Sequence, residues 1–300
     1  MPNHILAGVY AAALTPLHAD YTPDYAAIPQ LLSFLAKRGC HGALLLGTTG
    51  EGPSFEARER LEIFRVGLEI RQEYPDFRLL AGTGTPSLTE TIQLTRAAFD
   101  LGFDGAVVLP PYYYHQATAE GIFEWFHELI LRAVPGDGCI FGYHIPAQSG
   151  VPLSLDLLEK LKGAFPDQFA GIKDSSGDPQ FSQALGKRFG RDLVVLNGND
   201  AQLSQALENQ ASGCITAMAN LFSPDLRGVW EAYQQGQTAP EAQGRLSAQR
   251  TILSKYTPYA PSIKGIIARL HDFPHWPVRP PLQACPVEKI QLAVQELNAI

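Results

Sequence analysis

Cysteine is scarce in this chain and shows no pairing pattern. The sequence contains four cysteines, which lie far apart with no C-x-x-C pair: Cys40, Cys139, Cys214 and Cys285. Isolated cysteines of this kind favour buried free thiols in a reducing cytoplasm over zinc ligands or a disulfide framework. We therefore expect a cytoplasmic protein without a metal site.

Runs of positive charge are absent as well. The formal net charge is −7, so the sequence argues against nucleic acid and against an anionic membrane as partners. The first twenty residues lack a basic region, and Gly8, Tyr10 and Pro16 interrupt their apolar stretch. These interruptions predict neither a signal peptide nor a membrane span.

What the sequence does contain is a rhythm of short apolar segments, each followed by a stretch with helical spacing. The segments are GVYAAALTPL, GALLLGTTGEG, RLLAGTG, GAVVLPPYYY, CIFGYHIP, FAGIKDSSG, LVVLNGND and GCITAMAN. The helical spacing is carried by Ile28, Leu31, Leu32 and Leu35 after the first segment and by Leu61, Phe64, Val66 and Leu68 after the second. Helix starts are indicated by Pro86-Ser87-x-x-Glu90 and Ser223-Pro224-Asp225.

Strands that alternate with helices predict an α/β fold with a parallel sheet. Eight units of roughly 28 residues fit before residue 235, which is the size of a closed (β/α)8 barrel. An open doubly wound sheet is the competing architecture, but GTGTPS at 82–87 does not match its G-x-G-x-x-G fingerprint. We predict a (β/α)8 TIM barrel over residues 1–235.

Residues 236–300 show helical periodicity without further strands. The proline-rich DFPHWPVRPPL at 272–282 divides them, and Pro280-Pro281 excludes regular structure there. We interpret 236–300 as a C-terminal helical region packed on the barrel.

The most informative residue is Lys173, in the segment FAGIKDSSG. In such barrels the chemistry lies where strands end and loops begin. If Lys173 points into the barrel, Ile172 and Asp174 face the helices, because side chains alternate along a strand. Desolvation lowers the pKa of a lysine from about 10.4 towards 7–8, and a neutral amine attacks a ketone to form a Schiff base. The alternative is a structural lysine at the rim, snorkelling or ion-paired.

Three other strand ends carry unusual groups. Thr48 and Thr49 lie between glycines in GTTGEG, where exposed backbone N–H groups and hydroxyls can hold a carboxylate; a plain tight turn is the alternative. Tyr143 has inward parity and can relay protons, or it is a buried core tyrosine. Pro110-Pro111 ends a strand before three tyrosines, which also fit an interface patch.

Taken together, these stretches resemble the pyruvate-dependent class I aldolases that include dihydrodipicolinate synthase and N-acetylneuraminate lyase. The resemblance covers nearly the whole chain, through T-P at 15–16, GTTGE at 47–51, PPYYY at 110–114, YHIPAQSG at 143–150, GIKDSSGD at 171–178, NGND at 197–200 and the strand ending at Asn220.

The resemblance implies a role for each matched residue. Lys173 would form the imine with pyruvate or another 2-oxo acid, and Tyr143 would be the general acid/base. Thr48 and Tyr113 would complete a proton relay, with Tyr113 crossing from a neighbouring subunit. The resemblance implies substrate contacts at Gly47, Thr49, Ile215, Gly198, Asp200, Ser175 and Gln148. It also implies a homo-oligomer, a dimer of dimers, that needs no metal or organic cofactor.

The second substrate is where this sequence departs from the best-known members. The synthases carry an arginine where Gln148 stands, and an amide cannot pair with the carboxylate of aspartate semialdehyde. The sialic-acid lyases have a glutamate in place of Ala201 and a serine in place of Ala217. GTTGEGPS and LPPYYY are similar to the 2-keto-3-deoxygluconate aldolases. We therefore expect cleavage of a 2-keto-3-deoxy sugar acid to pyruvate and an aldehyde, or the reverse condensation.

The sequence leaves other functions open. The chain could be a 4-hydroxy-tetrahydrodipicolinate synthase or an N-acetylneuraminate lyase. A barrel that senses a 2-oxo acid without catalysis is a further alternative, although a sensor has no use for a nucleophile and a proton relay. Phosphate-sugar chemistry would need a glycine-rich phosphate site after strands seven and eight, which NGND and AMANLFSP fit poorly.

Overall fold

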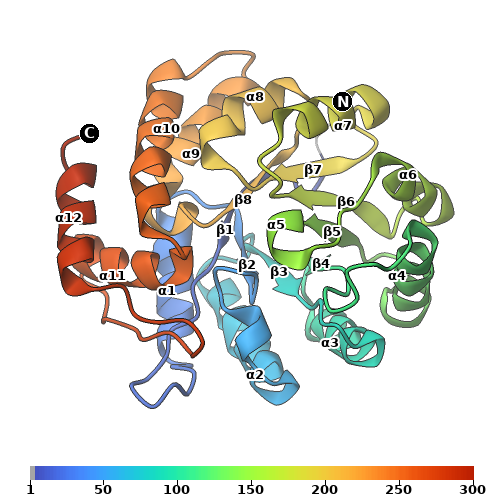
Figure 1. Ribbon diagram of the computed structural model, residues 1–300, viewed down its shortest axis with the longest axis horizontal. Helices are drawn as coiled ribbons and strands as arrows, with labels where there is room; N and C mark the ends of the chain where they lie inside the picture. The colour runs from blue at the N-terminus through green and yellow to red at the C-terminus, as the bar shows by residue number, and fades with distance from the viewer. Residues whose placement is uncertain (1–3) are drawn as a thin grey trace.

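The computed structural model describes residues 4–300, in which eight parallel strands close into a barrel (Figure 1). The strands are β1 (Gly8–Ala12), β2 (Gly42–Leu45), β3 (Arg78–Gly82), β4 (Gly105–Val108), β5 (Ile140–His144), β6 (Phe169–Asp174), β7 (Val194–Asn197) and β8 (Gly213–Thr216). Each strand pairs with the next, and β8 pairs with β1 to close the ring. The predicted (β/α)8 barrel is confirmed.

Helices alternate with the strands and form the outer layer. They are α1 (Ala27–Lys37), α2 (Ala57–Gly67), α3 (Leu88–Leu101), α4 (Ala119–Ala133), α6 (Leu155–Ala164), α7 (Pro179–Phe189), α8 (Leu203–Glu208) and α9 (Ala219–Gln234), with a single-turn α5 (Pro146–Ser149) after β5. Short 3₁₀ turns occur at η1 (Gly52–Ser54), η2 (Leu68–Gln72), η3 (Asp200–Gln202) and η4 (Ser254–Tyr256).

The two predicted helix starts had different outcomes. Ser87 caps α3 as predicted, because its side chain accepts a hydrogen bond from the Glu90 N–H at 3.3 Å. Ser223-Pro224-Asp225 begins the longer of two helical segments that make up α9, directly after the non-helical Phe222. A short helical segment from Ala219 precedes it, and the kink at Phe222, whose φ of −126° is not helical, separates the two. The prediction that a strand ends at Asn220 is wrong, because β8 ends at Thr216 and Asn220 lies in α9.

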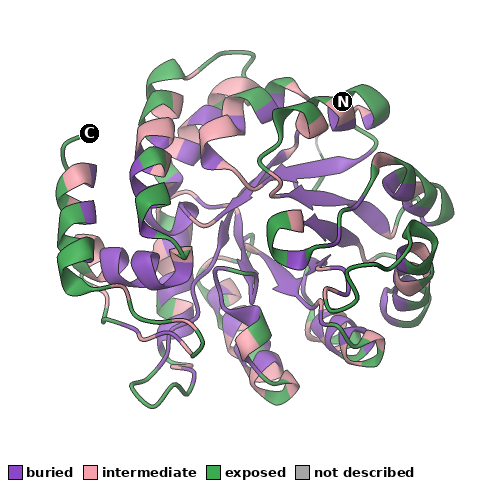
Figure 2. Ribbon diagram, viewed as in Figure 1, coloured by how far each residue is buried: buried purple, intermediate pink, exposed green. Residues whose placement is uncertain are grey.

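Apolar side chains form an inner and an outer layer, and Figure 2 shows the strands almost entirely buried, with Arg78 at the start of β3 half-buried. Inside the barrel pack Leu6, Tyr10, Ala12, Leu44, Leu80, Val107, Phe141, Tyr143, Ala170, Val194, Leu196 and Ile215. The predicted apolar face of α1 is buried. The prediction for α2 was wrong in phase: the buried face is Arg60, Ile63, Phe64 and Gly67, while Leu61, Val66 and Leu68 are half-buried.

The C-terminal residues are helical, and no strand follows β8 in the described chain. The helices α10 (Pro240–Leu253), α11 (Tyr259–His271) and α12 (Val287–Leu297) lie beside α1 and α9 on one side of the barrel (Figure 1). Irregular chain separates α11 from α12 where the prolines predicted it. The division at residue 235 stays a prediction.

Two observations bear on the cysteines and on membranes. Cys40 and Cys214 are buried free thiols, whereas Cys139 and Cys285 are only partly buried. Among residues 4–300, no helix combines the length and the apolar character needed to cross a bilayer.

Candidate active site

Lys173 lies inside the barrel at the end of β6, directly opposite Tyr143 on β5. The two residues are register partners, and both are buried, with 2% and 5% of their surface exposed. The Lys173 Nζ atom lies 4.0 Å from the centre of the Tyr143 ring. Within residues 4–300, no Asp or Glu oxygen lies within the 4.0 Å ion-pair distance of this amine. Ile172 packs in the outer layer, as strand alternation predicted.

Tyr143 is also joined to Thr48, which follows β2. The two hydroxyl oxygens are 3.1 Å apart, a hydrogen bond in which either group can donate. Burial alone raises the pKa of Tyr143, but the positive charge of Lys173 and the hydrogen bond with Thr48 outweigh it and leave the pKa below its ordinary value. The phenol is therefore a stronger acid than a free tyrosine.

The loop that carries Thr48 and Thr49 is held in a strained conformation. Leu46 and Glu51, at its two ends, both have a φ of 57°, the left-handed region that bulky residues avoid. A side chain at Gly52 could not be accommodated, because its Cβ would lie 2.0 Å from the Leu46 carbonyl oxygen. Thr49 is buried in this loop, with 8% of its surface exposed. Strain of this kind persists only where surrounding contacts enforce it.

A buried ion pair supplies such a contact. The Glu51 carboxylate accepts from Lys264 Nζ at 2.5 Å and from the Arg279 backbone N–H at 2.9 Å. Lys264, on α11, also donates to the Pro277 carbonyl at 2.7 Å, and at most 1% of either charged side chain is exposed. The sequence left Lys264 ambiguous and gave Glu51 no role. The one available signal was the position of Lys264 within an otherwise apolar helical run, PSIKGII.

The loops after β6 and β7 meet beside Lys173. The Ser175 N–H donates to the His144 carbonyl at 2.8 Å, and the Gly198 N–H donates to the Asp174 carbonyl at 2.7 Å. A Cβ atom at Gly198 would lie 2.1 Å from Ser175 Oγ and 2.9 Å from Ser175 Cβ, so any larger residue would displace the Ser175 side chain. The structure therefore brings Ser175 and Gly198 together at the carboxyl end of the barrel.

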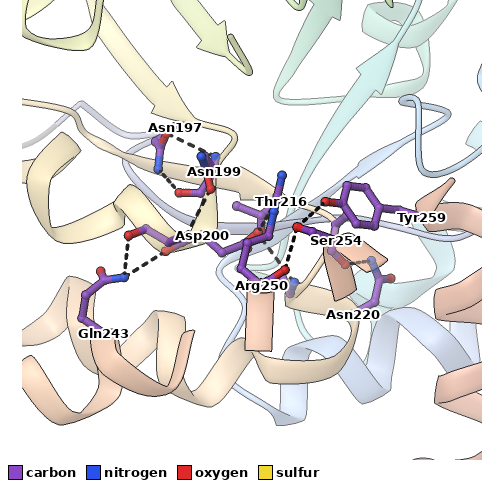
Figure 3. A network of polar contacts seen from close by, with 12 residues as sticks. Asn197, Asn199, Asp200, Thr216, Asn220, Gln243, Arg250, Ser254 and Tyr259 are labelled. Carbon is purple, nitrogen blue, oxygen red and sulfur yellow. Dashed lines mark hydrogen bonds and ion pairs between the residues drawn. The ribbon is translucent and has the colours of Figure 1, made fainter. Parts of the chain in front are cut away.

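Asp200, another predicted substrate contact, is held by residues of α10. Its side chain is fully buried and accepts from Arg250 Nη1 of α10 at 2.8 Å (Figure 3). Gln243 of the same helix donates to the Asp200 backbone carbonyl at 3.1 Å. Burial raises the pKa of Asp200, although the positive charge of Arg250 opposes the shift. One carboxylate oxygen, Oδ2, is thus paired within the chain, whereas the buried Oδ1 has no hydrogen-bond partner. The sequence could not indicate the pair, because Arg250 is fifty positions away.

The remaining predicted residues lie in different surroundings. Ile215 packs inside the barrel with 1% of its surface exposed. Gln148 is exposed on α5. Tyr113 is 75% exposed on the loop after β4, where its ring packs edge-on against Tyr114 at 5.3 Å. In the described part of this single chain, no hydrogen bond joins Tyr113 to Thr48 or Tyr143.

Sequence reasoning also missed Arg60, which lines a small cavity next to Tyr143. The cavity has a volume of about 30 Å³ and is bordered by Thr48 and Tyr143 as well. An available signal was the spacing of Arg60 from Ile63, Phe64 and Gly67, the i, i+3, i+4, i+7 pattern of a buried helix face.

The fold and this site define a class, the (β/α)8-barrel lyases that act on small molecules. Residues 5–299 match the model of the dihydrodipicolinate synthetase family. An uncharacterized DapA-like lyase of Chloroflexus aurantiacus is 40% identical over 92% of this chain and 90% of its own length. A 4-hydroxy-tetrahydrodipicolinate synthase of Corynebacterium urealyticum is 33% identical over 77% of this chain and 74% of its own. The crystal structure of dihydrodipicolinate synthase from Agrobacterium tumefaciens superimposes with a TM-score of 0.88, at 28% identity, covering 97% of this chain and 98% of that one.

The chain belongs to the dihydrodipicolinate synthetase family. It is an enzyme, a pyruvate-dependent class I lyase, as the resemblance implied. Membership in a family of lyases argues against the sensor alternative. It does not single out the aldehyde that partners pyruvate.

Proposed function

We propose that this enzyme cleaves a 2-keto-3-deoxy sugar acid to pyruvate and an aldehyde through an imine formed on Lys173. One observation carries the proposal: the amine is buried beside Tyr143, while no carboxylate of the described chain lies within ion-pair distance. A structural lysine in such a place is normally ion-paired, as Lys264 is with Glu51. An amine without such a partner is available to react with a ketone.

The chemistry follows from the positions of the amine and the phenol. Lys173 attacks the C2 carbonyl of the 2-oxo acid, and loss of water gives the protonated imine. Tyr143 accepts the proton of the C4 hydroxyl, the C3–C4 bond breaks, and its electron pair moves to the imine nitrogen as the enamine forms. The aldehyde leaves, C3 takes up a proton, and water releases pyruvate from Lys173. Thr48, at 3.1 Å, passes the proton on from Tyr143.

The carboxylate of the 2-oxo acid is assigned to the loop after β2. Thr49 and the backbone of Gly47 bind it, and the Ile215 carbonyl lines the pyruvate pocket. The strained, anchored loop supports this assignment, because a site that must orient an anion without a basic residue depends on fixed N–H groups.

The substrate tail is assigned to the loops after β5, β6 and β7. Gln148 provides an amide in place of a cation, which disfavours a second carboxylate on the aldehyde. Ser175 and the backbone of Gly198 bind hydroxyls of a short chain. Asp200, paired with Arg250 through Oδ2, holds the β7 loop in place.

A neighbouring subunit is assigned one part of the relay. Tyr113 is 75% exposed, and within the described chain no hydrogen bond joins it to Thr48. We therefore propose that it reaches the site of a second copy in a homo-oligomer, a dimer of dimers. Exposed aromatic rings of this kind are typical of subunit interfaces.

Borohydride trapping with pyruvate tests the imine. Wild-type protein is expected to gain the mass of a reduced pyruvate adduct on the peptide that contains Lys173, and Lys173→Ala is expected to gain none. Lys160→Ala is the matched control, because Lys160 is an exposed lysine paired with Glu120. A wild-type protein that binds pyruvate but stays unmodified would contradict the proposal.

A panel of aldehydes assayed for condensation with pyruvate tests the substrate class. Uncharged sugar aldehydes are expected to react faster than aspartate semialdehyde, because Gln148 cannot pair with a carboxylate. The 33% identity with a 4-hydroxy-tetrahydrodipicolinate synthase makes the synthase the second candidate. Faster turnover of aspartate semialdehyde than of every sugar aldehyde would establish it instead.

A further inference from the structure

Arg60 is a buried cation that the reaction proposed above does not use. It lies on the inner face of α2 with 3% of its surface exposed. Its Nη2 atom donates to the Gly82 carbonyl, at the end of β3, at 2.7 Å. This hydrogen bond brings the guanidinium to the same end of the barrel as Thr48 and Tyr143.

The positive charge of Arg60 forms no ion pair within the described chain. Across residues 4–300, no Asp or Glu oxygen lies within 4.0 Å of the guanidinium, and its Nε atom has no hydrogen-bond partner. Burial lowers the pKa of Arg60 to about 10. A buried charge without a partner is costly, and unusual electrostatics of this kind gather at functional sites. The charge therefore calls for a negative group that arises during the reaction.

A cavity connects Arg60 with the two hydroxyls. It has a volume of about 30 Å³, and Arg60, Thr48 and Tyr143 all border it. A cavity needs about 10–15 Å³ of this kind of volume to hold a water, and an internal water needs two to four polar partners. The cavity has room for a water and offers it the guanidinium and two hydroxyls.

Resting on the function proposed above, we propose that Arg60 is a positioning residue for Tyr143. Through one water in this cavity, it orients the Thr48–Tyr143 hydroxyl pair and offsets the negative charge on the phenol oxygen whenever Tyr143 has given up its proton. Arg60 keeps its own protons throughout. The proton exchanged with the C4 hydroxyl moves only between substrate, Tyr143 and Thr48.

Other charged groups face the same region from the elements around it. Lys173 approaches Tyr143 from β6, while Glu90 of α3 and Tyr112 of the β4 loop act on Arg60. None of these groups is altered in the comparison below, so a shift in the pH profile reports the charge at position 60.

The test compares Arg60→Met, which removes the charge, with Arg60→Lys, which keeps it. In condensation, Tyr143 acts as an acid, so activity falls as pH rises through its pKa. Loss of a nearby cation raises the pKa of a phenol. We expect Arg60→Met to move the alkaline limb of kcat upward by about one pH unit and to lower kcat roughly tenfold, with the KM for pyruvate unchanged. Arg60→Lys keeps the charge, so it is expected to retain most of the wild-type kcat and of the wild-type pH profile.

Arg58→Met is the matched control, because Arg58 is exposed on the same helix and the variant loses the same charge. Its profile is expected to match that of the wild type. A profile of Arg60→Met that coincides with that of Arg58→Met overturns the inference, and so does an Arg60→Lys variant as impaired as Arg60→Met. If Arg60→Met does not fold, Arg60→Gln replaces it as the uncharged variant. Borohydride trapping separates the two proposals: a wild type that traps no pyruvate refutes the imine, whereas an unchanged pH profile in a protein that does trap pyruvate refutes the role of Arg60.

Discussion

Replacement of Lys264 by methionine is expected to destabilise the whole barrel. Lys264 and Glu51 form an ion pair in which at most 1% of either side chain is exposed. The change removes two hydrogen bonds, to Glu51 at 2.5 Å and to Pro277 at 2.7 Å. Glu51 is then left buried with the Arg279 N–H as its remaining donor.

The magnitude follows from the burial of the pair. Removing one partner of a buried ion pair costs about 3–5 kcal/mol, because the other charge stays desolvated. This corresponds to roughly two to four powers of ten in the unfolding equilibrium constant. Burial lowers the pKa of Lys264 even though Glu51 opposes the shift, so the pair does not fully recover its desolvation energy. Adding Glu51→Gln to Lys264→Met is therefore expected to restore much of the lost stability.

Urea unfolding followed by far-UV circular dichroism measures these differences. The matched control is Lys255→Met, because Lys255 contacts Glu296 at 2.7 Å but 54% of its side chain is exposed. An exposed pair contributes about 0–1 kcal/mol. The reasoning is refuted if Lys264→Met costs no more than Lys255→Met, or if the double variant is less stable than Lys264→Met alone.

Two further substitutions test the site loops and the opposite end of the barrel. Gly198→Ala is expected to lower kcat/KM for the aldehyde and to cost about 1–3 kcal/mol of stability, because its Cβ would lie 2.1 Å from Ser175 Oγ. His41, whose Nδ1 accepts from the Val9 N–H at 2.9 Å, has its pKa lowered to about 4 by burial first and by nearby arginines second. The unfolded chain binds this proton more readily than the folded chain does, so the stability from His41 is complete above about pH 6.5 and is lost as pH falls towards 4. His41→Gln is expected to flatten this part of the pH–stability curve.

Each of these two substitutions has a control in the chain. Gly163→Ala places a methyl group on α6 where no atom lies within 4 Å, and it is expected to retain activity. His18 is 56% exposed, so His18→Gln serves as the exposed comparison for His41→Gln. Activity lost equally at positions 163 and 198 would contradict the steric argument. An acid limb in His41→Gln as steep as in the wild type would contradict the linkage argument.

The sequence by itself determined the barrel and the place of its chemistry. Short apolar segments alternating with helical spacing have few ways to bury both faces of a parallel sheet, so eight strands and their order could be read directly. Alternation along a strand also put Lys173 on the opposite face of β6 from Ile172, and strand parity predicted that Tyr143 points inward. These are local rules, and they need only neighbours in the chain.

The tertiary structure alone decided which charged groups meet. Lys264 with Glu51, Arg250 with Asp200, and Arg60 with the Thr48–Tyr143 cavity all join residues from different elements, and the spacing along the chain does not encode these approaches. The buried face of α2 was mispredicted for the same reason. An arginine is expected to be exposed unless its surroundings in the fold are known. Local periodicity records how a segment buries its own surface, whereas the environment of a buried charge depends on elements that only the closed barrel brings into contact.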